Sequence, residues 1–407
     1  MPERLQAGEP APRRRRWPWV LVAILLLLVL ARAFVADRYY VDSGSMMPTL
    51  YGPDEERGRS GDSVLVLYGG AGDLRRWDLV VVRRPDGRPV IKRVAGLPGE
   101  QVELVDGDLK IDGRLLPPDA PRPEPVLLLD ERWHPGEAHF KGAGPDGPWR
   151  REGDEWVLDA RDVEWASDRG LLYLREKLHA GWVEPDGERV HSELEVADGM
   201  LECEVRVDEP GGRLRLQLRE QGDVFQVCLR PVEGGLAEAE LVRWNSSIQR
   251  VPGGDERVQS LQRARIPFEL GRWHSLRFSN RDNALRLDVD DQRGALQAVY
   301  EANEQLPQRG ARSLGHPVLL GGEGLVARFR RLRVLRDQHY VTVPGMRAVG
   351  EAVILGPDEL FLLGDNSPQS TDSRDPQFGR VSSRDVLGRP MAVLWPPSRM
   401  RWLPRAR

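Results

Sequence analysis

Cysteine, histidine and lysine are all scarce in this 407-residue chain. The two cysteines, Cys203 and Cys228, exclude a cysteine-based metal cluster and a disulfide framework; they form either one disulfide or two buried thiols. The net charge is −4, so no overall basic field favours binding to nucleic acid. No motif calls for a metal or another cofactor. With 40% hydrophobic residues, the chain is long enough for two or more domains.

The N-terminal 36 residues divide into a basic tail and an apolar segment. Residues 1–16 end in four arginines, and Trp17 to Ala31 carries no charge before Arg32 interrupts the run. Twenty residues of helix span about 30 Å. Residues 17–36 therefore predict a transmembrane anchor, with the tail in the cytoplasm. A cleavable signal peptide ending near Ala33 is the alternative, and both interpretations place the rest of the chain outside the cytoplasm.

Two serines follow this segment closely, Ser43 and Ser45, within residues 42–50. Side chains two residues apart diverge on a helix, but they share a side in an extended strand or turn. Pro48 removes a backbone donor and disfavours helical geometry at Met47. Taken alone, the stretch is most simply a polar turn beside a membrane.

Lys92 stands in an apolar, strand-like run, although arginine is the usual cation here. The chain has 59 lysines and arginines, of which four are lysines: Lys92, Lys110, Lys141 and Lys177. Lysine can lose its proton when buried, whereas arginine cannot, and a neutral lysine can activate a serine hydroxyl. Lowering its pKa by roughly 2–3 units costs about 3–4 kcal/mol, which burial could supply. The alternative is an ordinary lysine at a strand edge.

Three stretches together resemble the sequence boxes of bacterial type I signal peptidases. Residues 43–50 resemble the nucleophile box, 91–100 the general-base box, and 363–374 the Gly-Asp-Asn…Ser…Asp-Ser-Arg box. They occur in the family's order behind an apolar segment. The resemblance covers residues 17–116 and 340–400.

This resemblance implies a Ser–Lys dyad, with Ser45 as nucleophile and Lys92 as general base. The backbone N–H of Ser45 and the hydroxyl of Ser43 would hold the oxyanion, and Ser370 would orient the lysine. The seven histidines lie between residues 134 and 339, outside all three boxes, which speaks against a Ser-His-Asp triad.

Further residues are expected to support the site. By the same resemblance, Asp372 and Arg374 pair and stiffen their loop, and Met46 contacts substrate. Residues 364–366 are expected to be a structural turn, in which glycine permits close backbone approach. Trp77 stands where the family usually has glycine.

The implied function is cleavage of N-terminal signal peptides from exported preproteins, after small residues in an Ala-X-Ala pattern. The implied place is the bacterial cytoplasmic (inner) membrane, with a single span and the catalytic part on the outer face. The partners are then preproteins, the lipid bilayer and the secretion translocon. Two alternatives stay open: a processing peptidase with a dedicated client, and a catalytically inactive anchored module that binds carbohydrate or protein.

The expected fold is mainly β. Residues 37–116 and 339–407 form a β-barrel-like catalytic core, because short β-branched runs alternate with Gly and Asp-Gly turns. The apolar run at residues 79–82 predicts a strand covered on both faces, or set against lipid on one face.

Residues 117–338 are expected to be an inserted antiparallel β-sandwich. Prolines at 117–125 mark a linker, and apolar residues then alternate with polar ones, as in residues 201–207. Residues 271–289 are similar to concanavalin-like jelly rolls. Paired carboxylates at a spacing suited to glycoside hydrolysis are missing, so the insertion is a spacer or a glycan- or protein-binding module.

Overall fold

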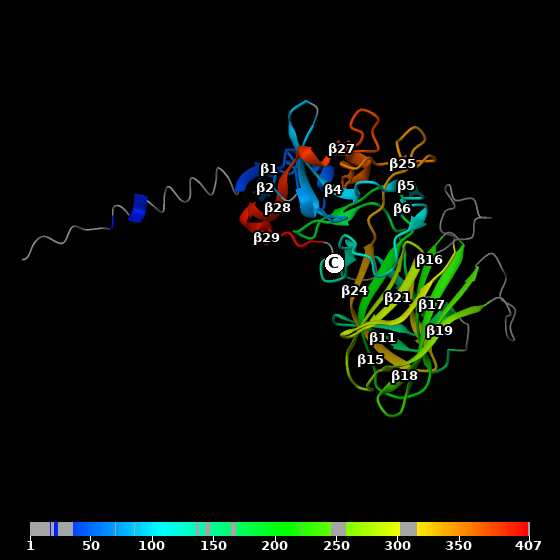
Figure 1. The fold of residues 1–407 in the computed structure, drawn as a ribbon. Coiled ribbons are helices and arrows are strands. Elements are labelled where there is room, and N and C mark those ends of the chain that lie inside the picture. Colours follow the sequence, from blue (N-terminus) through cyan, green and yellow to red (C-terminus); the bar gives the residue numbers. More distant parts are fainter. Residues whose placement is uncertain are drawn as a thin grey trace, which may run out of the picture.

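The computed structural model describes residues 17, 20–22, 36–69, 71–84, 86–135, 138–142, 147–163, 168–220, 222–245, 258–301 and 316–405. Over these residues the chain forms strands and short 3-10 helices joined by turns and loops, with α-helix only at residues 17 and 20–22, which confirms the mainly β prediction (Figure 1). The predicted anchor and the basic tail before it lie almost wholly outside the described residues. Within the described residues, no helix has both the length and the apolar character needed to cross a membrane.

Strands from both ends of the sequence form one antiparallel sheet, here called the catalytic sheet. Its order is β1 (Ala36–Tyr40), β2 (Ser63–Tyr68), β28 (Val386–Trp395), β3 (Leu79–Arg83), β4 (Pro89–Gly96), β26 (Glu359–Leu363) and β27 (Val381–Ser382), with β29 (Arg401–Trp402) paired to β28. The order has two ends, β1 and β27, so the described strands form an open sheet where a barrel-like core was expected.

Both faces of β3 are covered by protein. Leu79 and Val81 belong to one buried apolar cluster, and Val80 and Val82 belong to another. Successive side chains of a strand point to opposite faces, so this apolar run serves two cores at once. The alternative of a lipid-facing side for residues 79–82 is therefore wrong.

A smaller sheet packs beside the catalytic sheet. It has the order β25 (Val353–Ile354), β5 (Gln101–Val105), β6 (Asp108–Ile111) and β7 (Arg114–Leu115). Its apolar side chains share a buried cluster with Phe361 of β26 and with Tyr340. Tyr340 thus packs against the strands of residues 101–111, although it lies more than 200 residues later in the sequence.

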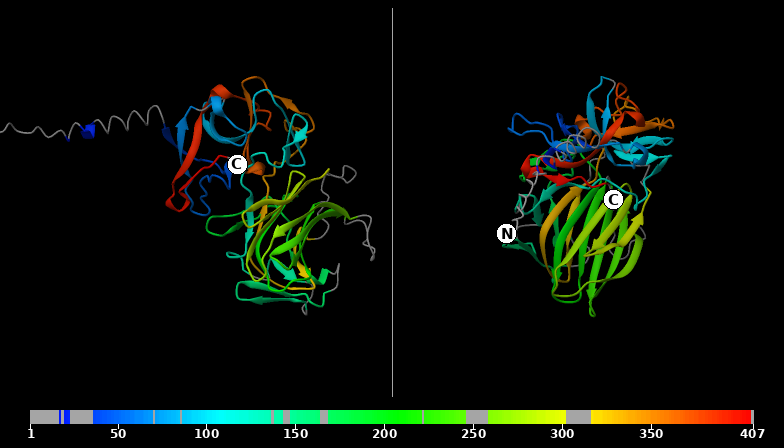
Figure 2. Two further views of the ribbon diagram at one scale, coloured as in Figure 1. Left: turned by 60° about the horizontal axis from the view of Figure 1, so that its bottom comes forward. Right: turned by 60° about the vertical axis from the view of Figure 1, so that its left-hand side comes forward.

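Residues 126–336 contribute two large antiparallel sheets (Figure 2). One contains β10 (Trp149–Glu152), β11 (Glu155–Asp159), β24 (Val326–Arg336), β15 (Gly199–Val207), β20 (His274–Arg281), β21 (Ala284–Val289) and β22 (Gln292–Val299), with β8 (Val126–Asp130) paired to β24. The other contains β19 (Gln259–Pro267), β18 (Leu236–Asn245), β17 (Asp223–Val232), β16 (Arg213–Glu220), β23 (Val318–Glu323), β12 (Leu171–Leu174) and β9 (Phe140–Gly142).

One buried apolar cluster lies between these two sheets and draws on both. Leu201, Cys203 and Val205 of β15 alternate with half-buried Glu202 and Glu204, as the period-2 pattern predicts. The two cysteines lie on strands of different sheets and are free thiols, which decides between the two alternatives.

The remaining described elements are short. The hairpin of β13 (Trp182–Val183) and β14 (Arg189–Val190) forms a separate two-stranded sheet that contacts β8, where Arg189 Nε donates to the carbonyl of Leu128 at 3.0 Å. The 3-10 helices are η1 (Gly44–Met46), η2 (Ala71–Asp73), η3 (Asp168–Gly170), η4 (Ser367–Gln369), η5 (Ser383–Asp385) and η6 (Pro397–Arg399). Domain boundaries at residues 117 and 338 remain predictions.

Candidate active site

The two serines lie in a tight turn directly before and within η1. Ser43 has extended backbone angles (φ −141°, ψ 158°), and its Oγ lies 3.3 Å from the Oγ of Ser45. Ser43 is exposed and Ser45 is half-buried. The turn therefore brings the two hydroxyls together on one side.

Met46 anchors this turn by packing its side chain into the apolar core. Its side chain is 1% exposed and packs in the apolar cluster that includes Val41 and Leu50. The structure thus puts Met46 in the core under the turn that carries Ser43 and Ser45, and a substrate contact through it stays a prediction.

Lys92 lies on β4 and points at both hydroxyls expected to be its partners. Its Nζ is 2.8 Å from Ser45 Oγ and 3.1 Å from Ser370 Oγ. The residue is only 3% exposed, and this burial lowers the pKa of Lys92 to about 8. The carboxylates of Asp372 and Asp365 oppose that shift, while Arg374 and Arg84 add to it. Burial dominates because removing an ammonium from water disfavours its charged form.

Arg93, the next residue on β4, faces the opposite way and organises a second set of contacts. Its Nε and Nη2 donate to the two carboxylate oxygens of Asp365 at 2.7 and 2.5 Å. Its Nη1 donates to the carbonyl of Trp77 at 2.8 Å, and Thr49 Oγ1 donates to Asp365 at 2.5 Å. This buried bidentate pair joins β4, which carries Lys92, to Thr49 after the serine turn and to Asp365 in residues 363–374.

The role of Arg93 was not predicted, and Asp365 was expected to be only a turn residue. The available signal was an arginine directly after Lys92 in an apolar strand, since a buried guanidinium requires a carboxylate partner.

The loop after β26 donates hydrogen bonds to the backbone of the turn that carries Ser43 and Ser45. The N–H of Asn366 donates to the carbonyl of Ser45 at 3.0 Å, and its side-chain amide donates to the carbonyl of Gly44 at 3.0 Å. A Cβ on Gly364 would lie 2.1 Å from Ser370 Oγ and 2.6 Å from the carbonyl oxygen of Ser45. Glycine at 364 is therefore required for the close approach of these serines.

Asp372 and Arg374 lie side by side beneath this loop. Arg374 Nη2 is 2.7 Å from Asp372 Oδ2, and Arg374 Nε donates to Asp372 Oδ1 at 2.9 Å. Both residues are almost completely buried. Asp372 also accepts from the N–H of Gly364 at 3.0 Å, and Arg374 donates to the carbonyl of Ser367 at 3.0 Å. The pair thus fixes both ends of the loop that carries Ser370.

Trp77 adopts a left-handed backbone conformation, with φ at 72°. Few residues other than glycine take this conformation without strain. Its ring is 4% exposed and stacks on Tyr340 with 6.2 Å between ring centroids. The left-handed backbone at residue 77 explains why glycine was expected there. This chain has a buried tryptophan at that position instead.

Among the described residues, two groups of side chains could hold a metal ion. Neither contains Ser45, Lys92 or Ser370. The arrangement at the serines is that of a hydroxyl nucleophile hydrogen-bonded to a buried amine, which can attack a carbonyl carbon once the amine is neutral. This is the chemistry of a serine peptidase.

The family described as signal peptidase, peptidase S26, matches residues 14–135 and 286–395, more than half of the chain. The chain belongs to this family and to the enzyme class of signal peptidase I, a serine peptidase.

Several curated relatives are similar to it. Signal peptidase I S of Bacillus subtilis (strain 168) is 36% identical over 154 residues, which cover 37% of this chain and 77% of the relative. Signal peptidase I of Bacillus licheniformis is 32% identical over 158 residues, covering 37% and 76%. Signal peptidase I of Bacillus caldolyticus is 36% identical over 103 residues, so this chain spans only about half (52%) of that protein.

Solved structures resemble the chain only distantly. The carbohydrate-binding module CBM66 of Bacillus subtilis has 9% identity and a TM-score of 0.31, covering 48% of this chain and 95% of the module. The β-glucanase of Bacillus licheniformis has 8% identity and a TM-score of 0.30, covering 50% and 94%. Scores this low support no argument about ligands, and the concanavalin-like assignment remains a prediction.

Proposed function

We propose that this protein is a membrane-anchored endopeptidase in which Lys92 is the general base for Ser45. The observation that carries the proposal is the 2.8 Å contact between Lys92 Nζ and Ser45 Oγ, made by an amine whose pKa burial lowers to about 8. A base must be within hydrogen-bond reach of the proton it removes, and its pKa should lie near the working pH.

In the proposed reaction, neutral Lys92 takes the proton of Ser45 as the hydroxyl oxygen attacks the scissile carbonyl. The protonated lysine then gives its proton to the leaving amine, which leaves an acyl group on Ser45. Lys92, neutral again, activates the water that hydrolyses this ester. Ser370 keeps the amine directed at Ser45, consistent with its 3.1 Å contact to Nζ.

The oxyanion is held by the backbone N–H of Ser45 and by the hydroxyl of Ser43. The 3.3 Å separation of the two serine hydroxyls supports this role, since Ser43 lies beside the atom that attacks. A donor aimed at the developing charge contributes about 2.7–4 kcal/mol in comparable sites.

The proposed substrates are exported preproteins, cleaved after small residues in an Ala-X-Ala pattern. The preprotein segment adds to the core as an extended strand, so its side chains alternate in direction and two small ones face the enzyme. The curated relatives are named as signal peptidases, which supports this substrate class.

Membrane attachment through residues 17–36 is part of the proposal. It is supported by exposed apolar side chains, three of them aromatic, on strands of the catalytic sheet and in the turn before β29. Tyr40 is 54% exposed, Trp395 49%, Met400 59% and Trp402 74%. Tyr40 and Trp395 both pair with Ser63 on β2, from opposite sides. Aromatic side chains at a protein surface are typical of the membrane interface.

The proposed topology follows from this attachment. The N-terminus is cytoplasmic and the catalytic sheet lies on the outer face of the bacterial inner membrane, beside the translocon. The sandwich of residues 117–338 is an inserted domain that projects from this core.

The test uses the detergent-solubilised chain and a preprotein with an Ala-X-Ala site. The expected result is a single cut after the second alanine, lost when that alanine is replaced by a bulky residue and lost in Ser45→Ala. Ser60→Ala is the matched control, because Ser60 is exposed on the same stretch and should leave cleavage unchanged. Cleavage by folded Ser45→Ala at the parent rate would refute the proposal.

A further inference from the structure

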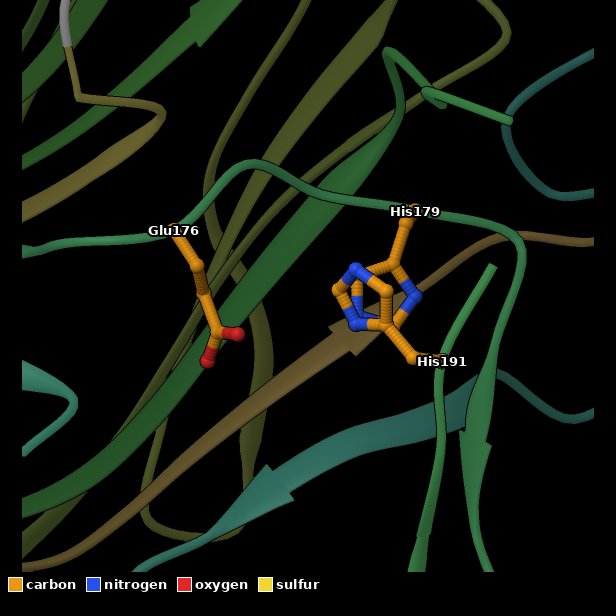
Figure 3. A group of neighbouring side chains, drawn as sticks. All are labelled: Glu176, His179 and His191. Atoms are coloured by element: carbon orange, nitrogen blue, oxygen red, sulfur yellow. The ribbon is translucent and has the colours of Figure 1, made fainter. Parts of the chain in front are cut away.

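Glu176, His179 and His191 form a compact group in the sandwich, outside the catalytic site (Figure 3). Glu176 and His179 lie on one stretch of chain after β12, and His191 follows β14. One potential ligand atom of each residue lies within 4.8 Å of those of the other two. The imidazole rings of the histidines are 4.1 Å apart between centroids, tilted by 59°.

His179 has a buried ring nitrogen without a hydrogen-bond partner. The residue is 4% exposed, and its Nε2 contacts no donor or acceptor among the described residues. Most buried polar atoms are satisfied, so an exception requires an explanation such as an unseen ion.

We propose that Glu176, His179 and His191 bind a divalent transition-metal ion, with Zn²⁺ as the best match. Two imidazole nitrogens and one carboxylate oxygen are a ligand set that zinc takes, with a fourth position left for water. Zinc ligand bonds are about 2.0–2.2 Å long, so tetrahedral donor atoms lie about 3.4 Å apart, and donor atoms as far apart as 4.8 Å must approach by about 1.4 Å. His191 is exposed and free to make most of that movement.

Two neighbouring groups set the affinity of this site. Arg189 Nη2 lies 2.8 Å from Glu176 Oε1, so its positive charge opposes the ion. The N–H of Gly181 donates to Nδ1 of His179 at 3.0 Å. Ligation through Nε2 moves the ring proton to Nδ1 and breaks that contact, which costs part of the binding free energy.

The ion would close a loop that reaches the catalytic part of the chain. Residues 179–191 enclose the β13–β14 hairpin, whose tip carries Glu184. Glu184 pairs with Arg59 at 3.0 Å and with Arg57 at 3.4 Å, on the segment between the nucleophile turn and β2. A ligand that binds only the folded state stabilises it, so zinc is expected to raise the melting temperature and to hold this hairpin in its docked position.

The test is equilibrium dialysis of the full, detergent-solubilised chain against ZnCl₂ after chelator treatment, followed by metal analysis and thermal melts. The parent is expected to bind one zinc per chain and to melt at a higher temperature with zinc. Losing one ligand should weaken binding by at least about 10–100-fold, the range known for loss of outer partners.

His191→Ala and Glu176→Gln are the informative variants, because His191 is exposed and its loss should leave the fold intact. His316→Asn is the matched control, since His316 stacks on Tyr173 and contacts the carbonyl of Leu174 and is not one of the three ligands, and it should bind like the parent. A parent that binds no zinc at micromolar concentration would overturn the proposal. Equal zinc affinity in the parent and in folded His191→Ala would also overturn it.

Discussion

The pH dependence of cleavage follows directly from the burial of Lys92. With a pKa of about 8, about 9% of Lys92 is neutral at pH 7 and about 90% at pH 9. kcat/KM should therefore rise about tenfold between these values and level off above pH 9, because the free enzyme needs a neutral base. A lysine at its ordinary pKa of 10.5 would be about 0.03% neutral at pH 7 and about 3% at pH 9, with the rate still climbing.

The assay is kcat/KM for a signal-peptide substrate from pH 6 to 10.5, with circular dichroism at each pH to show that the protein stays folded. A log-rate plot that keeps unit slope up to pH 10 would refute the depressed pKa. A flat profile from pH 6 upward would remove a titrating base from the rate-limiting step.

The same burial makes stability depend on pH. Between the folded pKa of about 8 and the unfolded value, the unfolded chain binds more protons, so stability rises with pH across this window. The cost of the buried charge, about 3 kcal/mol below pH 8, should shrink as the pH rises through this window and vanish near the unfolded pKa. Denaturant titrations of the parent and of Lys92→Met, compared at pH 7 and 10, measure it; a pH-independent difference contradicts this account.

Two substitutions test the loop that positions the serines. Gly364→Ala puts a methyl group 2.1 Å from Ser370 Oγ; misplacement of reacting groups by about 1 Å should lower kcat about 100-fold, whereas Gly72→Ala, with open space around it, should not. Asp365→Asn leaves the buried Arg93 guanidinium without its anion, so urea titration should show a loss of about 3–5 kcal/mol. An unchanged kcat for the first, or a loss below about 1 kcal/mol for the second, would contradict the roles given to these residues.

Residue chemistry foresaw the mainly β fold and the strand at residues 79–82. The scarcity of lysine singled out Lys92, because most cations of this chain are arginines and Lys92 stands in an apolar strand. Family order then linked residues 43–50 with residues 363–374, which local patterns alone could not have joined.

The parts that were missed depend on tertiary packing. The bidentate pair of Arg93 and Asp365 joins residues far apart in sequence, so local spacing indicates that Arg93 needs a carboxylate but not which one. The burial of Met46 depends on which face of the turn meets the core. The open order of the catalytic sheet depends on pairing between chain ends, which strand propensity does not determine.

The contacts of the β13–β14 hairpin with Arg57 and Arg59 were not foreseen either. From the sequence alone, charged residues such as Arg57, Arg59 and Glu184 are expected to lie in solvent-exposed turns, because their partners are in another part of the chain. For the same reason the proximity of Glu176, His179 and His191 emerges only from the folded hairpin.

The central claim is that Lys92 is the base for Ser45, and Lys92→Arg tests it most directly. Arginine keeps the charge and most of the volume but cannot give up its proton. Lys110→Arg is the matched control on β6, and melting curves show that both variants fold. We predict that Lys92→Arg loses about 10²–10⁴-fold in kcat for a preprotein substrate while Lys110→Arg keeps the parent rate. Cleavage by folded Lys92→Arg at the parent rate would contradict the Ser–Lys mechanism.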